Sequence, residues 1–390
     1  MKIVWAVLLV GTPVQGQFLR SLADELLDNP EFSANDRVNT SEEFLTLLNE
    51  QGDIGRLWIG PFSTVESGEL QIFDQFELFA ANSDVSLTFD YELQDEEVSV
   101  TEFVSVLNTQ GQLGYQYAAP ISFGNFITGE NIVTRYLFAR TSGSQETFEY
   151  QTLPTTEASL NLEVINTQGA SGWEWLGPQV VGSFPNLELV DLFVRRAGQN
   201  EIFTYFQEAT TRTPTSFLDQ VNAQGELGRF WMGDFVVSNG LEFESFAVFR
   251  QNSQQDSTYT YSLLPSVNTR ASLLEQANAQ GEEGFAYLSP QVFPTDNPAI
   301  FTSFELYISR TAERGVGPTS EDFNLDLEDD QLTFSTSVSG NFQLFESENL
   351  VDWNPLGEIR SSVGEEIIWV LEPSELSQRF FTVGRISDLD

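Results

Sequence analysis

The chain of 390 residues contains no cysteine and no histidine, and its only lysine is Lys2. Without cysteine it can form no disulfide, no zinc–thiolate site and no thiolate nucleophile. Without histidine it lacks the side chain that most often acts as a general base or metal ligand near neutral pH. These two absences exclude most familiar catalytic and metal centres. They do not indicate a reducing compartment, because exported proteins without disulfides also occur.

Positive charge is scarce as well. The chain has 17 basic residues against 58 acidic ones, which gives a formal net charge of −41. Such a surface repels nucleic acids and anionic lipids, so neither is expected as a partner. With 41% apolar residues the chain can nevertheless bury ordinary cores, and we expect it to be globular.

The N-terminus has the order of segments that is typical of a secretory signal peptide. Lys2 precedes an apolar run over residues 3–11, and the short residues Val14 and Gly16 follow. We predict a signal peptide over residues 1–16 and hence a secreted or cell-envelope protein. A buried first strand over residues 2–10 is the alternative. No other stretch has the length of a membrane span.

Residues 17–40 are predicted to form a lead-in helix and a linker. Apolar residues at 18, 19, 22, 23, 26 and 27 have helical spacing, and Asn29-Pro30 ends the pattern.

The rest of the chain is dominated by the motif Asn-x-Gln-Gly-x-x-Gly, which occurs five times. The first glycines of successive copies are 56 to 59 residues apart. This period predicts a repeat of one small supersecondary unit. We place the repeats at residues 41–98, 99–156, 157–212, 213–268 and 269–313.

Each motif is predicted to close a helix and to open a strand. Amphipathic segments precede the first glycine, and we expect this glycine to adopt the left-handed conformation that caps a helix. The second glycine should lead into the strand. The glycine pairs are Gly52 and Gly55, Gly111 and Gly114, Gly169 and Gly172, Gly225 and Gly228, and Gly281 and Gly284.

A large aromatic residue stands three positions after the second glycine in every repeat. We predict that these residues pack in the core, with a sugar-stacking platform as the alternative. They are Trp58, Tyr117, Trp175, Trp231 and Tyr287. A proline then follows in four repeats and should end or bulge the strand. The Asn and Gln of the motif are expected to bond the backbone at the helix end, a ring of ligand contacts being the alternative.

A second strand in each repeat ends in an aliphatic–aromatic pair such as Leu137-Phe138 and is followed by a short polar link. Links of this length are typical of hairpins, so we expect this strand to pair with the strand that comes next in the chain. Repeat 1 shows no leading strand in the sequence, whereas residues 322–327 form a spare alternating segment. This segment could complete repeat 1 and close the repeats into a ring; an open row or independent pairs are the alternatives.

Beyond a linker at residues 314–320 the repeat stops. Residues 321–390 contain short alternating strands and predict a separate all-β, sandwich-like domain. The acidic cluster Asp326, Glu328, Asp329 and Asp330 leaves Ca²⁺ open as a ligand, although it lacks the spacing of an EF-hand loop, and a solvated turn is the simpler interpretation.

These patterns also carry two resemblances. A helix ending in Leu-Asn-x-x-Gly, then x-x-Gly-Trp and a strand ending in Phe-x-Arg, resembles a small bacterial family of domains of unknown function. The match is best over residues 162–196, with Gly169, Gly172, Trp173 and Phe193. Residues 321–390 are similar to a β module at the C-termini of secreted bacterial proteins. The first resemblance implies an α+β fold of helix-plus-antiparallel-sheet units and implies no activity.

The expected function is a non-enzymatic binding or scaffold protein whose partner is an unknown protein or glycan. Five nearly equivalent units are typical of a scaffold, whereas an active site is usually a single asymmetric place. The alternative is an extracellular polysaccharide hydrolase that uses paired carboxylates. The Gly-x-x-Gly segments do not suggest nucleic-acid binding, because acidic residues such as Asp53 and Glu226 would repel phosphate. No catalytic, cofactor-binding or metal-binding residue and no oligomeric state is assigned.

The charge imbalance generates a prediction about salt. Carboxylates without basic partners repel one another across the folded surface, and salt screens this repulsion. The melting temperature should therefore rise between nearly salt-free buffer and about 0.5 M NaCl, where the Debye length falls to a few ångströms. Thermal melts over this range test the prediction. A melting temperature that stays constant or falls would show that the acidic groups are already paired or too dispersed to matter.

Overall fold

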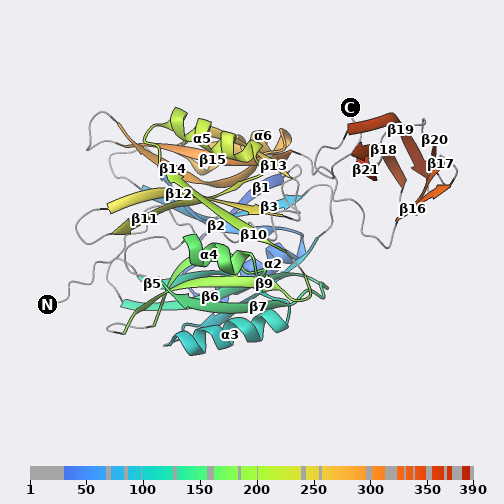
Figure 1. Cartoon of the computed structure of the whole chain (residues 1–390). Coiled ribbons are helices and arrows are strands. Elements are labelled where there is room, and N and C mark those ends of the chain that lie inside the picture. Colours follow the sequence, from blue (N-terminus) through green and yellow to red (C-terminus); the bar gives the residue numbers. More distant parts are fainter. Residues whose placement is uncertain are drawn as a thin grey trace. The chain divides into compact units, whose positions relative to one another are not determined.

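The computed structural model in Figure 1 describes residues 30–311 and six strands beyond them. Within 30–311 the gaps are 67–71, 83–86, 98, 126–129, 156–161, 183–185, 200, 239–242, 254–256 and 296–300. The predicted signal peptide, the lead-in helix and the linker at 314–320 lie outside the described residues. The chain divides into two compact units, one formed by residues 1–253 and 259–310 and the other by 254–258 and 311–390.

Five similar units of strand, helix, strand and strand make up the first compact unit. Each unit, called a repeat from here on, includes the strand before its helix, so it begins earlier in the chain than the predicted repeat. Repeats 1 and 2 contain β1 (Pro30–Asp36), α2 (Ser41–Asp53), β2 (Leu57–Glu66), β3 (Ile72–Asn82), β4 (Phe89–Asp95), α3 (Val100–Gln112), β5 (Gln116–Asn125) and β6 (Glu130–Thr141). Repeat 3 contains β7 (Phe148–Pro154), α4 (Leu162–Gly169), β8 (Glu174–Val181) and β9 (Glu188–Arg196). Repeats 4 and 5 contain β10 (Phe203–Ala209), α5 (Pro214–Glu226), β11 (Phe230–Ser238), β12 (Phe243–Asn252), β13 (Thr258–Pro265), α6 (Arg270–Glu282), β14 (Ala286–Pro294) and β15 (Phe301–Thr311). The predicted fivefold α+β architecture is confirmed.

Each repeat forms its own three-stranded antiparallel sheet with its last strand in the middle. The strand orders are β1-β3-β2, β4-β6-β5, β7-β9-β8, β10-β12-β11 and β13-β15-β14. The predicted hairpin between consecutive repeats is therefore wrong. The middle strand already has a partner on both sides, as β6 does with β4 and β5, so the polar link after it leads into a new sheet.

Repeat 1 also has a leading strand, which corrects the prediction for this region. β1 lies in residues assigned above to the linker, and it pairs with β3 from Pro30↔Asn82 to Asp36↔Phe76. The sequence prediction treated Pro30 only as a helix stop, although an edge strand tolerates proline at its first position. The supposed spare strand is β16 (Phe323–Glu328), and it pairs with β17 (Gln331–Thr336) in the second compact unit.

Four of the helices begin at a side-chain N-cap. Thr40, Ser99, Thr213 and Thr269 are N-caps, and each side-chain oxygen accepts a hydrogen bond from the backbone N–H three residues later. The helix ends differ from the prediction, because the first glycine of each motif lies inside the last helical turn. Positive φ occurs at the second glycine instead, with values of 75° to 86° at Gly55, Gly114, Gly172, Gly228 and Gly284.

The reason for the first glycine is a close approach between repeats. A Cβ atom at this position would lie 2.0–2.2 Å from a carbonyl oxygen in the first strand of a neighbouring sheet. The pairs are Gly52 with Phe89, Gly111 with Phe148, Gly169 with Phe203, Gly225 with Tyr259 and Gly281 with Pro30. No side chain fits there, so this glycine is required by packing and not by its own φ.

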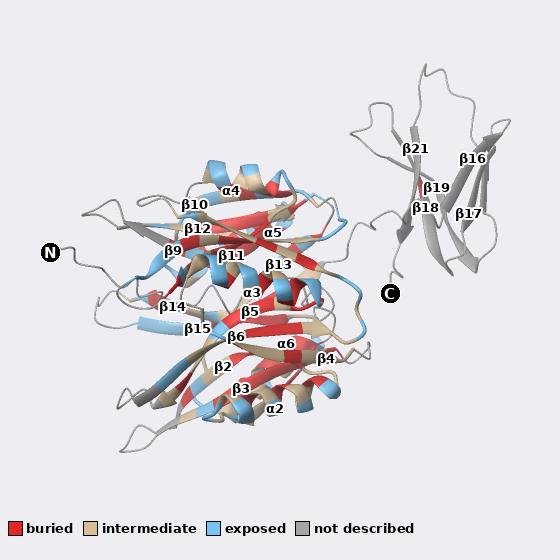
Figure 2. Ribbon diagram, turned by 90° about the horizontal axis from the view of Figure 1, so that it is seen from below, coloured by how far each residue is buried: buried red, intermediate tan, exposed pale blue. Residues whose placement is uncertain are grey.

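The core lies between each helix and the sheets beneath it. Figure 2 shows the buried residues on the strands and on the inward faces of the helices. The five motif aromatics are all buried, in agreement with the core prediction. Phe44 of α2 packs edge-on against Trp58, and Phe217 of α5 does the same with Trp231. A β-bulge directly after each aromatic precedes the proline position, as with the register shift between Trp58 and Gly60.

In the second compact unit, all the described elements are strands. β16, β17 and β20 (Ile367–Val370) form one three-stranded sheet in the order β16-β17-β20. β18 (Ser339–Ser347), β19 (Asn354–Val363) and β21 (Phe380–Ile386) form another, in the order β19-β18-β21. All pairings are antiparallel.

Candidate functional site

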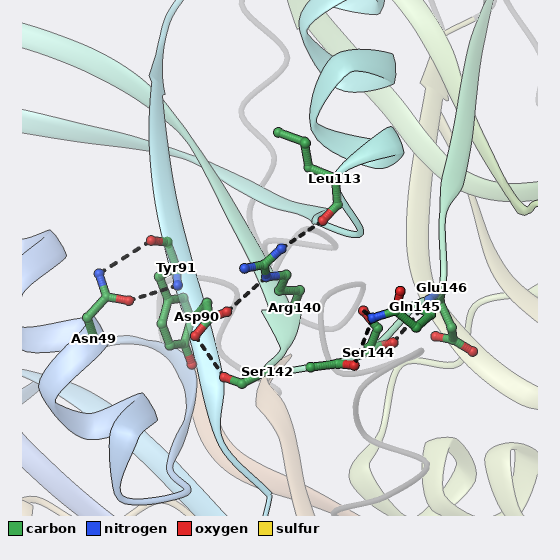
Figure 3. Close-up of polar contacts among 10 residues, drawn as sticks. Asn49, Asp90, Tyr91, Leu113, Arg140, Ser142, Ser144, Gln145 and Glu146 are labelled. Atoms are coloured by element: carbon green, nitrogen blue, oxygen red, sulfur yellow. Dashed lines mark hydrogen bonds and ion pairs between the residues drawn. The ribbon is translucent and has the colours of Figure 1, made fainter.

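The five motif asparagines connect one repeat to the next. Each side chain bonds both backbone groups of one residue in a first strand: Oδ1 accepts from its N–H at 2.6–2.9 Å, and Nδ2 donates to its C=O at 2.9–3.3 Å. Figure 3 shows this pair of bonds between Asn49 and Tyr91. Asn49 and Asn108 also donate to their own helix, but the main partner is the neighbouring strand, which the sequence prediction missed.

A tyrosine in the same first strands holds the aromatic residue of the preceding repeat. The backbone N–H groups of Trp58, Tyr117, Trp175 and Trp231 donate to the hydroxyls of Tyr91, Tyr150, Tyr205 and Tyr261, respectively, at 2.6–2.9 Å. Burial raises the pKa of the Tyr91 and Tyr150 hydroxyls, which therefore stay protonated at neutral pH. The motif glycines, asparagines and aromatics are thus all occupied by contacts that join repeats.

Repeat 5 makes the asparagine and glycine contacts with repeat 1, but Phe32 stands in place of the tyrosine, so the hydroxyl bond is absent there. Asn278 of α6 bonds the N–H and C=O of Phe32, and Gly281 faces the carbonyl oxygen of Pro30. Tyr287 lies edge-on against Phe62 with ring centroids 5.3 Å apart. At the start of α6, Arg270 forms a two-bonded ion pair with Asp74 and a third bond to Asp36.

Buried carboxylates accompany the core aromatics. The indole N–H of Trp58 donates to Glu77 at 2.8 Å and that of Trp175 to Asp191 at 2.9 Å, while the Tyr287 hydroxyl donates to Glu305 at 2.7 Å. Burial raises the pKa of both Glu77 and Asp191, and the indole donors oppose the shift.

Repeat 4 carries its carboxylate on the opposite strand. In repeats 1, 3 and 5 the acidic residue of the middle strand faces a proline, as in Glu77↔Pro61, whereas in repeat 4 Asp234 faces Ala247. Asp234 is accessible to solvent, yet the surrounding protein desolvates it and raises its pKa to about 6, against a smaller opposing effect of Trp231. A solvent-accessible carboxyl with this pKa is a candidate proton donor.

One contact between repeats has no counterpart elsewhere. Arg250 of β12 donates to Glu174 of β8, and both side chains are almost fully buried. The positions equivalent to Arg250 hold Ala80, Ala139, Val194 and Ile308. Close by, burial raises the pKa of Glu201, and the Glu174 carboxylate adds to this shift while Arg196 and Arg250 oppose it. Among the described residues, the contact between repeats 3 and 4 is therefore one of two charged contacts that break the repeat, the other being that of Arg270 with Asp74 and Asp36.

An open pocket lies beside this contact. Its volume is about 520 Å³, and it is formed by the loop after α4, the end of β9 and the link to β10. The charged lining residues are Glu149, Arg195, Arg196 and Glu201. Arg195 is held by Glu149 and lies over the Trp173 ring, 4.5 Å from its centroid.

Other kinds of site are not apparent among the described residues. No group of three or more acidic side chains there is arranged to hold a metal ion. The cluster Asp326 to Asp330, for which Ca²⁺ was left open, lies outside the residues whose side chains are described. Within the same described part of the chain, no helix has the length and apolar character needed to cross a bilayer.

The raised carboxyl pKa values predict a pH dependence of stability. In the unfolded chain these carboxyls titrate near 4, so around pH 5 the folded state binds protons that the unfolded state has released. The free energy of unfolding should then fall as the pH rises from about 4 to about 6 and beyond. Asp234→Asn should flatten this dependence, because the amide cannot ionise. Urea denaturation at pH 5 and pH 7.5 measures it, with Asp219→Asn on the exposed face of α5 as the control. Equal slopes for both variants would contradict the role of Asp234.

Comparison of the chain with protein-family models, with curated proteins and with solved structures finds no match. The resemblances to a bacterial repeat family and to a C-terminal β module therefore remain predictions. Any functional conclusion has to be drawn from the contacts and the pocket described above.

Proposed function

We propose that the protein is a secreted or cell-envelope scaffold, without enzymatic activity, that binds an extracellular protein or glycan. The observation that carries the proposal is the use of the repeated residues. The motif Gly, Asn and aromatic residues, the most conspicuous chemical pattern in the chain, are occupied by contacts between repeats. Residues that recur in all repeats therefore hold the repeats together. A ligand would be recognised where one repeat differs from the others.

The proposal includes closure of the five repeats into a ring and a sandwich-like C-terminal domain. Closure is supported by the contacts of Asn278, Gly281 and Tyr287 with residues of repeat 1, which match the contacts between consecutive repeats. In a closed ring no terminal repeat has an uncovered face. An uncovered face would expose apolar surface and unpaired strand edges, which promote aggregation. The sandwich arrangement is supported by the two three-stranded sheets of the C-terminal unit.

Polysaccharide hydrolysis is the second candidate, and one observation favours it. Asp234 is solvent-accessible and its pKa is raised to about 6, as a general acid requires. A glycosidase would also need a second carboxylate several ångströms away. The scaffold is preferred because Glu77, Asp191 and Glu305 already accept hydrogen bonds from core aromatics.

A glycan array combined with an activity screen on the same purified protein tests the function. The proposal expects binding of at least one extracellular glycan or protein and no turnover of the bound glycans. Turnover that Asp234→Asn abolishes while binding persists would establish the hydrolase instead. Control measurements use Asp219→Asn, which leaves the carboxylates of the core untouched.

Two substitutions in α6 test ring closure. In a ring, Asn278→Ala leaves the N–H and C=O of Phe32 without their partner and should cost about 2 kcal/mol of unfolding free energy. Gly281→Ala should destabilise the fold as well, because its Cβ would meet the Pro30 carbonyl oxygen. Chemical denaturation of both variants measures the loss, with Asn49→Ala as the matched internal contact.

In an open row, residues 278 and 281 would face solvent. Asn278→Ala would then be nearly neutral, and Gly281→Ala would stabilise the helix slightly, since alanine has the higher helix propensity. That pair of results, with Asn49→Ala still destabilising, would contradict the ring.

A further inference from the structure

We propose that the pocket of repeat 3 is a binding site for a glycan that carries a single carboxylate, such as a terminal uronic acid. This inference rests on the proposed binding function and assigns it to one place. Repeat 3 differs here from repeat 2, where the corresponding arginine makes one more hydrogen bond to the protein.

In repeat 2 the arginine at this position is fully engaged. Arg140 donates through Nε to Asp90 and through Nη1 to the carbonyl oxygen of Leu113 (Figure 3). It also lies over the Tyr115 ring, 4.5 Å from its centroid. The glycine of the loop is packed tightly too, because a Cβ at Gly114 would meet Glu146 O at 2.9 Å and the Arg140 side chain at 3.9 Å.

In repeat 3 the corresponding arginine, Arg195, has the carboxylate and the aromatic partner but not the backbone carbonyl partner. Arg195 is held by Glu149 through Nε and Nη2 and lies over the Trp173 ring, in direct correspondence with Arg140. Among the described residues, nothing takes the role that Leu113 O has for Arg140. One edge of the guanidinium is therefore left for a ligand.

Small residues in the loop explain why the space is open. The two residues between the motif glycines are Ala170 and Ser171 in repeat 3. In every other repeat at least one of these two residues is large or acidic, as in Gln112-Leu113. A Cβ at Gly172 would meet only Glu201 O, at 3.3 Å. The resulting volume of about 520 Å³ lies in the range that holds small organic ligands.

The lining chemistry selects the ligand. Arg195 lines the pocket in a chain with only 17 basic residues, and guanidinium groups bind carboxylates through paired hydrogen bonds. Arg196, which also lines the pocket, forms an ion pair with Glu146 at 3.6 Å, so Arg195 is the residue expected to hold the ligand. Glu149 and Glu201 are acceptors for hydroxyl groups, and Gln199 can both donate and accept. A sugar acid presents a carboxylate together with several hydroxyls, which matches this set.

The net charge limits the ligand to one carboxylate. At −41 the molecule repels polyanions over a distance of about one Debye length, so an all-uronate polymer would be disfavoured at low salt. A neutral glycan with one uronic acid avoids this repulsion and still engages Arg195.

Calorimetric titration of the full-length protein with a disaccharide containing one glucuronate or galacturonate tests the site. The neutral disaccharide, in which the carboxyl is reduced to an alcohol, is the paired ligand. The uronate should bind at least tenfold more tightly than the neutral sugar, as expected for a charge-assisted hydrogen bond. Arg195→Gln should weaken uronate binding at least tenfold, whereas Arg140→Gln, the matched substitution in the closed repeat, should leave it unchanged.

Ser171→Leu provides a second test that does not remove a charge. It gives the loop the residue found at Leu113 in repeat 2, and it should abolish binding by filling the pocket while thermal melts show the fold intact. Equal affinity for both sugars, equal effects of the two arginine variants, full binding by Ser171→Leu, or tighter binding of free amino acids would each overturn the inference. Binding of other glycans that these variants do not affect would sink this site but keep the proposed function. No binding of any glycan or protein would refute both.

Discussion

The approach of each helix to the first strand of a neighbouring sheet is the constraint on which the rest of the structure depends. A carbonyl oxygen lies where the Cβ of the first motif glycine would be, so backbone meets backbone without side chains between them. At this separation the motif asparagine can reach both polar groups of the strand, and the strand tyrosine can reach the N–H of the core aromatic. Glycine, asparagine and aromatic recur together because one approach requires all three.

This close packing explains why polar groups appear in an apolar interior. Indole N–H and phenol O–H groups buried with the core rings need acceptors, and Glu77, Asp191 and Glu305 supply them. The acceptors are themselves desolvated, which raises the pKa of Glu77 and Asp191. In repeat 4 a carboxylate, Asp234, lies on the opposite strand of the pair, where Trp231 partly opposes the rise of its pKa.

Much of the fold could be predicted from the sequence, because the information was local. The repeat period, the helix before each motif and the burial of Trp58 follow from patterns within one unit. The failures concern partners far away in the chain. The role of Gly52 depends on Phe89 O, and the place of β6 in the middle of its sheet depends on two strands at once, which no short-range pattern records. Of the candidate site, Arg195 was visible as the arginine of the Phe-x-Arg pattern, but the open pocket was not, since it arises from the small residues opposite it.

Nearly equivalent repeats raise a further problem, which is how each unit selects its proper neighbour. If the contacts were interchangeable, repeats could pair in the wrong order. Buried charges restrict such mispairing, because a buried charge without a partner costs several kcal/mol of stability. Arg250 can be buried only beside Glu174, so repeat 4 is stable next to repeat 3 and not next to repeats whose equivalent residue is Leu57 or Ala286. The charges of Glu174 and Arg250 also act on Glu201, which lines the pocket together with Arg196. Repeat 3 thus departs from the other repeats twice, in the buried Glu174 that orders the units and in the small loop residues that open the pocket.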